Sequence, residues 1–394
     1  MRSALALAFV IALGCAPDGH RAPPLHPGDG EAARAIATVV LSRPITVPDN
    51  FVMRPDEFAG VTADHERGVV YTGSREGTLL AIEADRGDVR WERDLHGGVG
   101  SIPVLAELGA GETVLLVGTD NGILFAIDPD TQKERWRYAT DGRVRSAPVV
   151  LEGVVYFANS RDQVFALDVK TGDWRWQYEQ ELQTDFTVYG HAGLTLVPSA
   201  DPAAPEQGIV LACFDNGKVV ALSAGAGESM WIASVAPAGG GNFVDCDATP
   251  LADVARGLVF VSGQSTGVHA LQLADGTAVW NFPMRGASTV VDAPGGALAT
   301  ASSLEGVFAL DRDGGLLWRR QLDPGSLSVP LVVGDTLVLT HSEAGLVALD
   351  ASTGELLGRL FTGSGMSSTP SWDPIGERIY AITNRGILIG LHLD

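Results

Sequence analysis

Apolar and polar positions follow a clear pattern between residues 163 and 176, where the chain reads Q-V-F-A-L-D-V-K-T-G-D-W-R-W. The short run Val164–Leu167 places side chains alternately on two faces, and a period of two predicts a β-strand. Asp168 follows, where its carboxylate can accept hydrogen bonds from the backbone amides of a tight turn. Gly172 supplies the positive φ that such a turn needs, and Trp176 closes the unit.

The same pattern returns about every 40 residues, so it is a structural repeat. Seven copies are followed by the beginning of an eighth, at Gly386. Six copies end in a tryptophan: Trp91, Trp136, Trp176, Trp231, Trp280 and Trp318. An aromatic residue that binds a ligand would occur once or twice, whereas these recur from unit to unit. We therefore interpret them as structural tryptophans that wedge between neighbouring units, each indole N–H bonded to a backbone carbonyl.

Each unit also carries a fixed segment ahead of this stretch. A glycine, or an aspartate in the third unit, marks a turn between two apolar strands: Gly77, Gly122, Asp162, Gly217, Gly267, Gly306, Gly345 and Gly386. Earlier in each unit, a short strand is predicted to end in Ser-x-Pro or a variant, as in Ser146-Ala147-Pro148. Four antiparallel strands about every 40 residues are typical of the blades of a β-propeller.

The last unit lacks its fourth strand, because the chain stops at Asp394. The β-branched stretch from Ile36 to Val47 precedes the first unit and has no hairpin partner nearby. Pairing this stretch with the last unit would close the ring and remove both open edges. The sequence therefore predicts an all-β fold: an eight-bladed β-propeller of four-stranded antiparallel blades, closed by an N-terminal strand and spanning residues 36–394.

The N-terminus has the features of a secretory signal. The apolar run Ala4–Leu13 follows a short positive region and is too short to span a bilayer as a helix. Ala12-Leu13-Gly14-Cys15 resembles a bacterial lipobox, which implies a signal peptide over residues 1–14 and lipidation of Cys15. An ordinary signal peptide cleaved nearby is the alternative. Residues 15–35 are predicted to form a flexible tether, and Ala16 implies sorting to the outer membrane.

The composition argues against several classes of function. The formal net charge is −21, whereas binding to nucleic acid needs a basic surface for the phosphates. The histidines are scattered along the units without the spacing of a metal-ligand set. No Ser-His-Asp arrangement can be assigned from the spacing. We therefore expect no metal, no nucleic-acid partner and no catalytic residue.

The repeat A-x-D-x-x-T-G-x-x-x-W resembles the tryptophan-docking motif of the pyrroloquinoline-quinone (PQQ) dehydrogenase propellers, over residues 58–394. Members that bind the quinone carry two adjacent cysteines, a stacking tryptophan and a calcium-binding set of acids and amides. This chain has three cysteines, none of them adjacent: Cys15, Cys213 and Cys246. Its repeat carboxylates recur as turn residues do. The resemblance thus implies the fold, and we expect no bound quinone, no other cofactor and no enzymatic activity.

The lipobox, the eight repeats and the chain length are together similar to the BamB family of propeller lipoproteins, which belong to the outer-membrane β-barrel assembly machine. The resemblance implies a non-enzymatic scaffold on the bacterial outer membrane that faces the periplasm. Its contacts would be the membrane, through the lipid anchor, and proteins of that machinery, with the chain present as a monomer within a complex. The alternatives are a ligand-binding or redox propeller of the PQQ superfamily, or a general protein-interaction module.

In that family, an Asp-x-Asp segment and a Leu/Arg loop on the preceding blade contact the partner barrel protein. Asp245 and Asp247 match the first element. Alternatively, the two aspartates cap the turn that leads into the fifth unit. The second element departs from the family, because Leu182-Gln183-Thr184-Asp185-Phe186 contains no arginine. Leu182 and Asp185 are the candidates there. The fourth unit is expanded and could be a redesigned docking edge, with an exposed loop over Pro198–Gln207.

Two cysteines fall close together in the predicted propeller. Cys213 is expected at the end of a strand in the fourth blade, and Cys246 at the start of the inner strand of the fifth. Those ends lie on the same face of adjacent blades, so a disulfide is possible in an oxidising periplasm. Two separate buried thiols are the alternative, because disulfide geometry is demanding.

Overall fold

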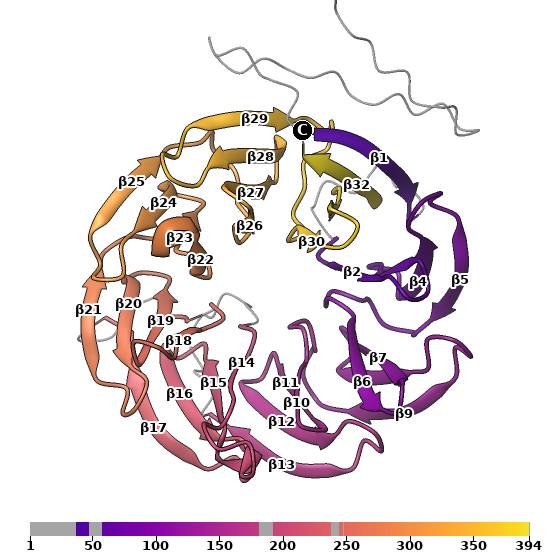
Figure 1. The fold of residues 1–394 in the computed structure, drawn as a ribbon, viewed down its shortest axis with the longest axis horizontal. Helices are drawn as coiled ribbons and strands as arrows, with labels where there is room; N and C mark the ends of the chain where they lie inside the picture. Colours follow the sequence, from indigo (N-terminus) through magenta and orange to yellow (C-terminus); the bar gives the residue numbers. More distant parts are fainter. Residues whose placement is uncertain (1–36, 47–56, 181–191, 238–243, 247, 394) are drawn as a thin grey trace, which may run out of the picture.

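Eight four-stranded antiparallel sheets stand around a central axis (Figure 1). The computed structural model describes residues 37–46, 57–180, 192–237, 244–246 and 248–393. Over these residues the fold is the predicted eight-bladed β-propeller. The helices among them are two short 3-10 turns, η1 (Pro205–Gln207) and η2 (Pro294–Gly296). No helix in the described part of the chain is long and apolar enough to cross a membrane.

Each of the first seven blades consists of four strands that follow one another in the chain. Blade one comprises β2 (Val61–Asp64), β3 (Val69–Gly73), β4 (Thr78–Glu83) and β5 (Val89–Asp94), and blade two comprises β6 (Val104–Gly109), β7 (Glu112–Gly118), β8 (Ile123–Ile127) and β9 (Glu134–Ala139). Blade three comprises β10 (Val149–Leu151), β11 (Val154–Asn159), β12 (Gln163–Asp168) and β13 (Trp174–Glu179). Blade four comprises β14 (Thr195–Val197), β15 (Ile209–Cys213), β16 (Lys218–Ser223) and β17 (Ser229–Ser234). Blade five comprises β18 (Leu251–Asp253), β19 (Leu258–Gly263), β20 (Gly267–Gln272) and β21 (Ala278–Phe282). Blade six comprises β22 (Val291–Ala293), β23 (Ala297–Ser302), β24 (Gly306–Leu310) and β25 (Leu316–Arg320). Blade seven comprises β26 (Leu331–Val333), β27 (Thr336–His341), β28 (Gly345–Asp350) and β29 (Leu356–Leu360).

The eighth blade closes the ring in the way the sequence predicts. Its strands are β30 (Ser371–Asp373), β31 (Arg378–Ile382), β32 (Ile387–Leu393) and, from the other end of the chain, β1 (Ala37–Pro44). β1 pairs antiparallel with β32, and Leu41 lies opposite Gly390. The N-terminal strand therefore supplies the missing fourth strand, so the two ends of the chain meet within one sheet (Figure 1).

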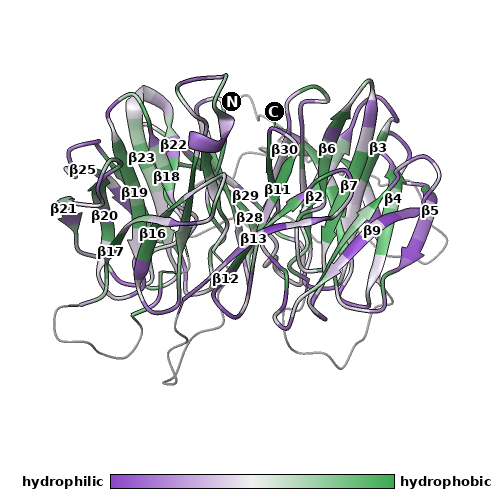
Figure 2. Cartoon of the chain, turned by 90° about the horizontal axis from the view of Figure 1, so that it is seen from below, coloured by the Kyte–Doolittle hydropathy of each residue, from purple (hydrophilic) through white to green (hydrophobic). Residues whose placement is uncertain are grey.

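The core lies between the blades. The middle strands of each blade are buried along nearly their whole length, as in β3 and β12. Figure 2 shows apolar residues concentrated along such middle strands and polar residues on outer strands such as β5 and β9. Burial on both faces explains why these strands are continuous apolar runs, whereas the outer strands alternate.

The tryptophans of the outer strands join each blade to the next. In five blades, the indole Nε1 donates a hydrogen bond of 2.8–3.0 Å to a backbone carbonyl of the following blade. The accepting residue comes directly after the turn aspartate or after the residue at the same position. The pairs are Trp136–Val169, Trp176–Ala224, Trp231–Leu273, Trp280–Arg312 and Trp318–Ala351. The ring of Trp136 lies flat on Gly172, where a Cβ atom would come within 2.7 Å of it. Gly172 has φ 76°, so this turn needs glycine for two reasons. The carboxylate of Asp168 accepts from the amides of Lys170 and Thr171, as predicted.

One detail differs from the prediction. The Ser-x-Pro segments precede the innermost strands instead of ending them: Pro148 comes directly before β10. A proline cannot donate to the ladder, which favours a position just outside the strand. The loop over Pro198–Gln207 is largely exposed, as predicted, and joins β14 to β15. It therefore lies on the face opposite to the turn between β15 and β16.

Replacing Trp176 by alanine tests the role of the tryptophans. Trp176 is 5% exposed and packs on Gly227 of the next blade. We expect Trp176→Ala to lower the free energy of unfolding, measured by urea denaturation, by about 3–5 kcal/mol. Trp174 on the same strand is 58% exposed, so Trp174→Ala is the matched control, with an expected change of about 0.5 kcal/mol or less. Equal losses from the two variants would contradict this role.

Candidate functional site

The two faces of the propeller carry different connections. In an antiparallel meander, the turns between the second and third strands lie on the same face as the segments that lead from one blade to the next. We call this the linker face; residues 159–162 and 213–218 are examples of its turns. The other two turns of every blade lie on the opposite face. The candidate residues Asp245 and Cys213 belong to the linker face.

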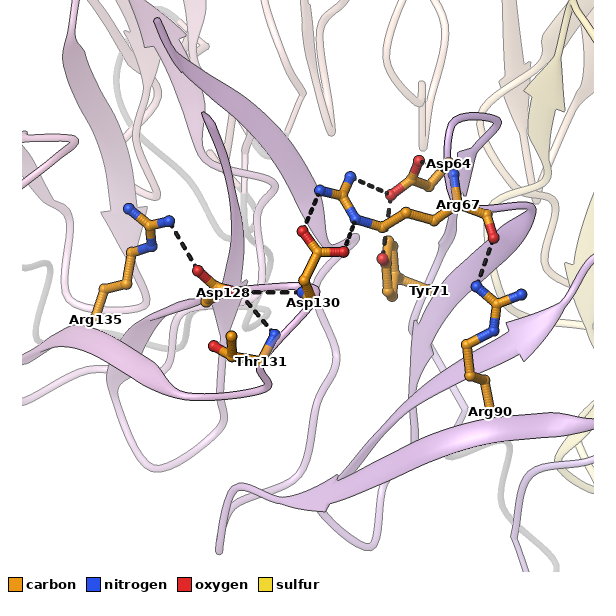
Figure 3. A network of polar contacts seen from close by, with 8 residues as sticks. All are labelled: Asp64, Arg67, Tyr71, Arg90, Asp128, Asp130, Thr131 and Arg135. Atoms are coloured by element: carbon orange, nitrogen blue, oxygen red, sulfur yellow. Dashed lines mark hydrogen bonds and ion pairs between the residues drawn. The ribbon is translucent and has the colours of Figure 1, made fainter. Parts of the chain in front are cut away.

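Polar groups on the opposite face hold neighbouring blades together. Arg67 of blade one forms an ion pair through Nε with Oδ1 of Asp130 in blade two, at 2.7 Å, and through Nη1 with Asp64 at 3.0 Å (Figure 3). The hydroxyl of Tyr71 donates to Asp64 at 3.1 Å. In a similar way, Arg312 of blade six binds Asp253 of blade five. Because each of these charges has a partner between blades, the network is explained by the fold.

The structure describes one of the residues expected at the partner-binding site. Asp245 is fully buried, and its backbone carbonyl accepts a hydrogen bond from the amide of Gln264 at 3.0 Å. This burial favours a structural role for Asp245 over direct contact with a partner. The other expected residues lie outside the described residues: Asp247, Leu182, Asp185 and the lipidation site Cys15.

Cys213 and Cys246 meet between blades four and five. The structure joins them in a disulfide, with Cα atoms 5.3 Å apart. Cys213 ends β15, as predicted, but Cys246 lies several residues before the inner strand β18 instead of starting it. The amide of Cys246 donates to the carbonyl of Phe214. The bond therefore ties the segment that leads into blade five to the turn of blade four.

Peptide mapping tests the bridge. Digestion of unreduced protein should yield a linked peptide that contains Cys213 and Cys246, and blocking reagents should find no free thiol at either residue. The bond spans 33 residues, so removing both cysteines should lower the free energy of unfolding by about 3–4 kcal/mol in the chain-entropy account. Reductant should destabilise the native protein and leave the double variant unchanged. Full alkylation of both cysteines without reductant would refute the bridge.

Asp162 belongs to the candidate site but is not among the site residues predicted from the sequence. It occupies the turn position where the seven other blades have glycine. Those glycines have φ between 69° and 94°, and Asp162 has φ 55°. The left-handed conformation is unfavourable for a residue with a Cβ atom, although aspartate tolerates it better than most. The signal was present in the sequence, because one aspartate interrupts a column of glycines.

The carboxylate of Asp162 is enclosed. The residue is 8% exposed, and its Oδ1 accepts a hydrogen bond from the amide of Asp215 in blade four, at 3.3 Å. Oδ2 has no hydrogen-bond partner among the residues that the structure describes. Burial, together with the nearby charge of Asp245, raises the pKa of Asp162 to about 6 against the opposing effect of the hydrogen bond from the Asp215 amide.

A small pocket opens beside this carboxylate, between blades three and four. Its lining includes Ser146, Ser160, Asp162, Cys213 and Asp215. Ser146 is 8% exposed, and its hydroxyl also has no partner within the described part of the chain. No group of histidine, cysteine and carboxylate residues able to hold a metal ion occurs among the described residues. The pocket therefore combines a buried carboxylate with a buried hydroxyl, without a metal-ligand set.

The buried charge of Asp162 should make stability depend on pH. Its pKa is higher in the folded state than the ordinary value of 3.8, so the stability it contributes is complete below pH 4 and is lost as the pH rises through 6. Asp162→Asn keeps the shape and removes the charge. In urea denaturation, the variant should gain about 1–2 kcal/mol over the wild type between pH 5 and pH 8. A constant difference across this range would contradict the raised pKa.

With this geometry in view, the fold and its tryptophan docking define an eight-bladed propeller of the PQQ-repeat class. The family whose sequence profile matches is described as outer membrane protein assembly factor BamB, over residues 50–108, 105–312 and 264–394. The chain belongs to this family.

Individual relatives agree with this assignment. The outer membrane protein assembly factor BamB of Alkalilimnicola ehrlichii is 31% identical over 206 residues, 51% of this chain and 52% of the relative. The Legionella pneumophila protein of the same name is 28% identical over the same shares. The match thus spans about half the length of these two relatives. The Shewanella oneidensis protein of that name is 26% identical over 84% of this chain and 70% of its own.

Solved structures show the same fold. BamB from Moraxella catarrhalis superposes with a TM-score of 0.72 at 19% identity, covering 91% of this chain and all of that one. Quinohemoprotein alcohol dehydrogenase from Comamonas testosteroni gives a TM-score of 0.66 at 15% identity, over 90% of this chain and 76% of its own. Identities this low show a shared architecture and leave function to other observations.

Proposed function

We propose that this protein is a lipid-anchored, non-enzymatic propeller that docks other proteins during the assembly of outer-membrane β-barrel proteins. The observation that carries the proposal is the match to the BamB family over residues 50–394. A closed ring suits this role, because its interlocked blades hold the linker face rigid while the loops on it vary. In this proposal Cys15 bears the lipid, and residues 15–35 let the propeller reach its partners from the periplasmic side of the outer membrane.

The partner is proposed to bind the linker face around blades three to five. Departures from the repeat gather there: Asp162 at a glycine position, the disulfide between Cys213 and Cys246, and the Asp-x-Asp segment. A site on a repeat protein must differ from blade to blade, since a feature present in every blade is required by the fold. Because Asp245 is buried, we assign the direct contact to Asp247 and to Leu182.

Affinity capture from solubilised membranes tests the proposal. A tagged wild-type chain should retain a β-barrel assembly component. Asp247→Lys should reduce the recovered partner about tenfold or more, because reversing a charge within an interface costs more than 1.4 kcal/mol. The measurement is quantitative mass spectrometry of the captured proteins.

The matched control reverses an exposed charge on the opposite face. Asp313 lies in an exposed turn of blade six, and Asp313→Lys should leave the captured amount unchanged. Capture of no assembly component by the wild type would refute the proposed function. Equal losses from the two variants would refute the assignment of the linker face.

A further inference from the structure

Within the part of the chain that the structure describes, the pocket between blades three and four has no counter-charge in its lining. Asp162 and Asp215 contribute carboxylates to its lining, and no lysine, arginine or histidine among the described residues belongs to it. Blade two shows what such a carboxylate on the linker face normally meets. There Arg145 binds both oxygens of Asp120, at 2.6 and 2.7 Å.

Two polar groups that are more than nine-tenths buried face this pocket without a partner in the described residues: Oδ2 of Asp162 and Oγ of Ser146. The equivalent serine of blade two shows the contrast. Ser101 both donates to and accepts from the backbone of Gly118, at 3.0 Å. Ser146 makes no such pair with its own blade. Buried polar groups normally find partners, so these two indicate a missing donor.

The fold also makes room for the aspartate. At Gly122, the same position in blade two, a Cβ atom would lie 2.6 Å from the carbonyl oxygen of Thr140. Asp162 has a Cβ atom, so the chain that leaves blade three must run farther from this turn than the chain that leaves blade two. Aspartate is thus kept here against backbone preference and against the cost of burying a charge. A bound cation would offset both.

We propose that this pocket binds an ammonium or guanidinium group, with the carboxylate of Asp162 as counter-charge and the hydroxyl of Ser146 as a second acceptor. A cation that carries N–H donors can donate a hydrogen bond to each of these two groups and can also neutralise the carboxylate. A water molecule could donate the hydrogen bonds but would leave the negative charge in place. A lysine or arginine side chain of a docked protein is the source that follows from the proposed function, on which this part of the inference rests. A free small amine is the other source.

The first experiment uses methylguanidinium as the probe, with the neutral methylurea for comparison. Ligand-observed NMR at pH 8 should give a dissociation constant of roughly 1–10 mM for methylguanidinium, the range expected for so small a ligand. Methylurea should bind at least fivefold more weakly. Asp162→Gly should weaken methylguanidinium binding at least fivefold, and this variant should fold because seven blades have glycine there. Equal binding by the wild type and Asp162→Gly would overturn the proposal.

The matched control removes an exposed carboxylate from the same face. Asp94 is 62% exposed at its side chain at the end of β5, and Asp94→Asn should bind the probe as the wild type does. A loss as large as that of Asp162→Gly would mean that the probe senses only the overall negative charge, which overturns the pocket assignment.

The second experiment identifies the source of the cation. In affinity capture, Asp162→Gly should lower the recovered assembly component at least threefold if a basic side chain enters the pocket. If the probe binds while capture by the variant is unchanged, the protein source is refuted and a free amine remains. If the probe fails to bind while the wild type still captures its partner, this inference fails and the proposed function stands. If the probe binds and nothing is captured, the proposed function alone fails.

Discussion

The docking of an indole on the glycine turn of the next blade is the contact on which the whole ring depends. It combines the burial of a large aromatic surface with one hydrogen bond to a carbonyl, and it recurs between successive blades. Its direction explains why the outer strand of blade seven, β29, has no tryptophan. The last two strands of blade eight, β32 and β1, come from opposite ends of the chain, so no turn joins them. Among the described residues, blade eight therefore offers no glycine turn on which an indole of blade seven could dock, and Gly358 occupies the tryptophan position.

The ring closes with a smaller version of the same contact. Leu41 of β1 takes the tryptophan position of blade eight and lies 3.6 Å from the point where a Cβ atom of Gly87 would be. In blade two the glycine itself is replaced, by Gln132 with φ 60°. The ring therefore tolerates a change at these junctions, as expected when stability is shared among many similar interfaces. This tolerance lets individual blades acquire other features.

Most of the fold could be predicted from the sequence, because every repeat carries the same local signals. Alternation, turn glycines and tryptophans are local signals, and the unpaired N-terminal strand follows from counting strands. The candidate site was harder to predict. Asp245 was expected at a partner contact from the resemblance alone, yet it is fully buried. Burial on the linker face depends on which side chains arrive from the adjacent blade, and periodicity along one chain carries no information about that.

The contrast between the two faces links the fold to function. On the opposite face, Arg67 and Arg312 neutralise carboxylates across blade boundaries, so those charges stabilise the ring. On the linker face, blade two does the same with Arg145 and Asp120, whereas Asp162 keeps one oxygen without a partner among the described residues. The fold can plainly place an arginine at such a boundary. A carboxylate that is buried, strained and without a partner for one oxygen among the described residues marks a place where the repeat gives up stability. In the binding proposed above, a donor from outside would recover that energy.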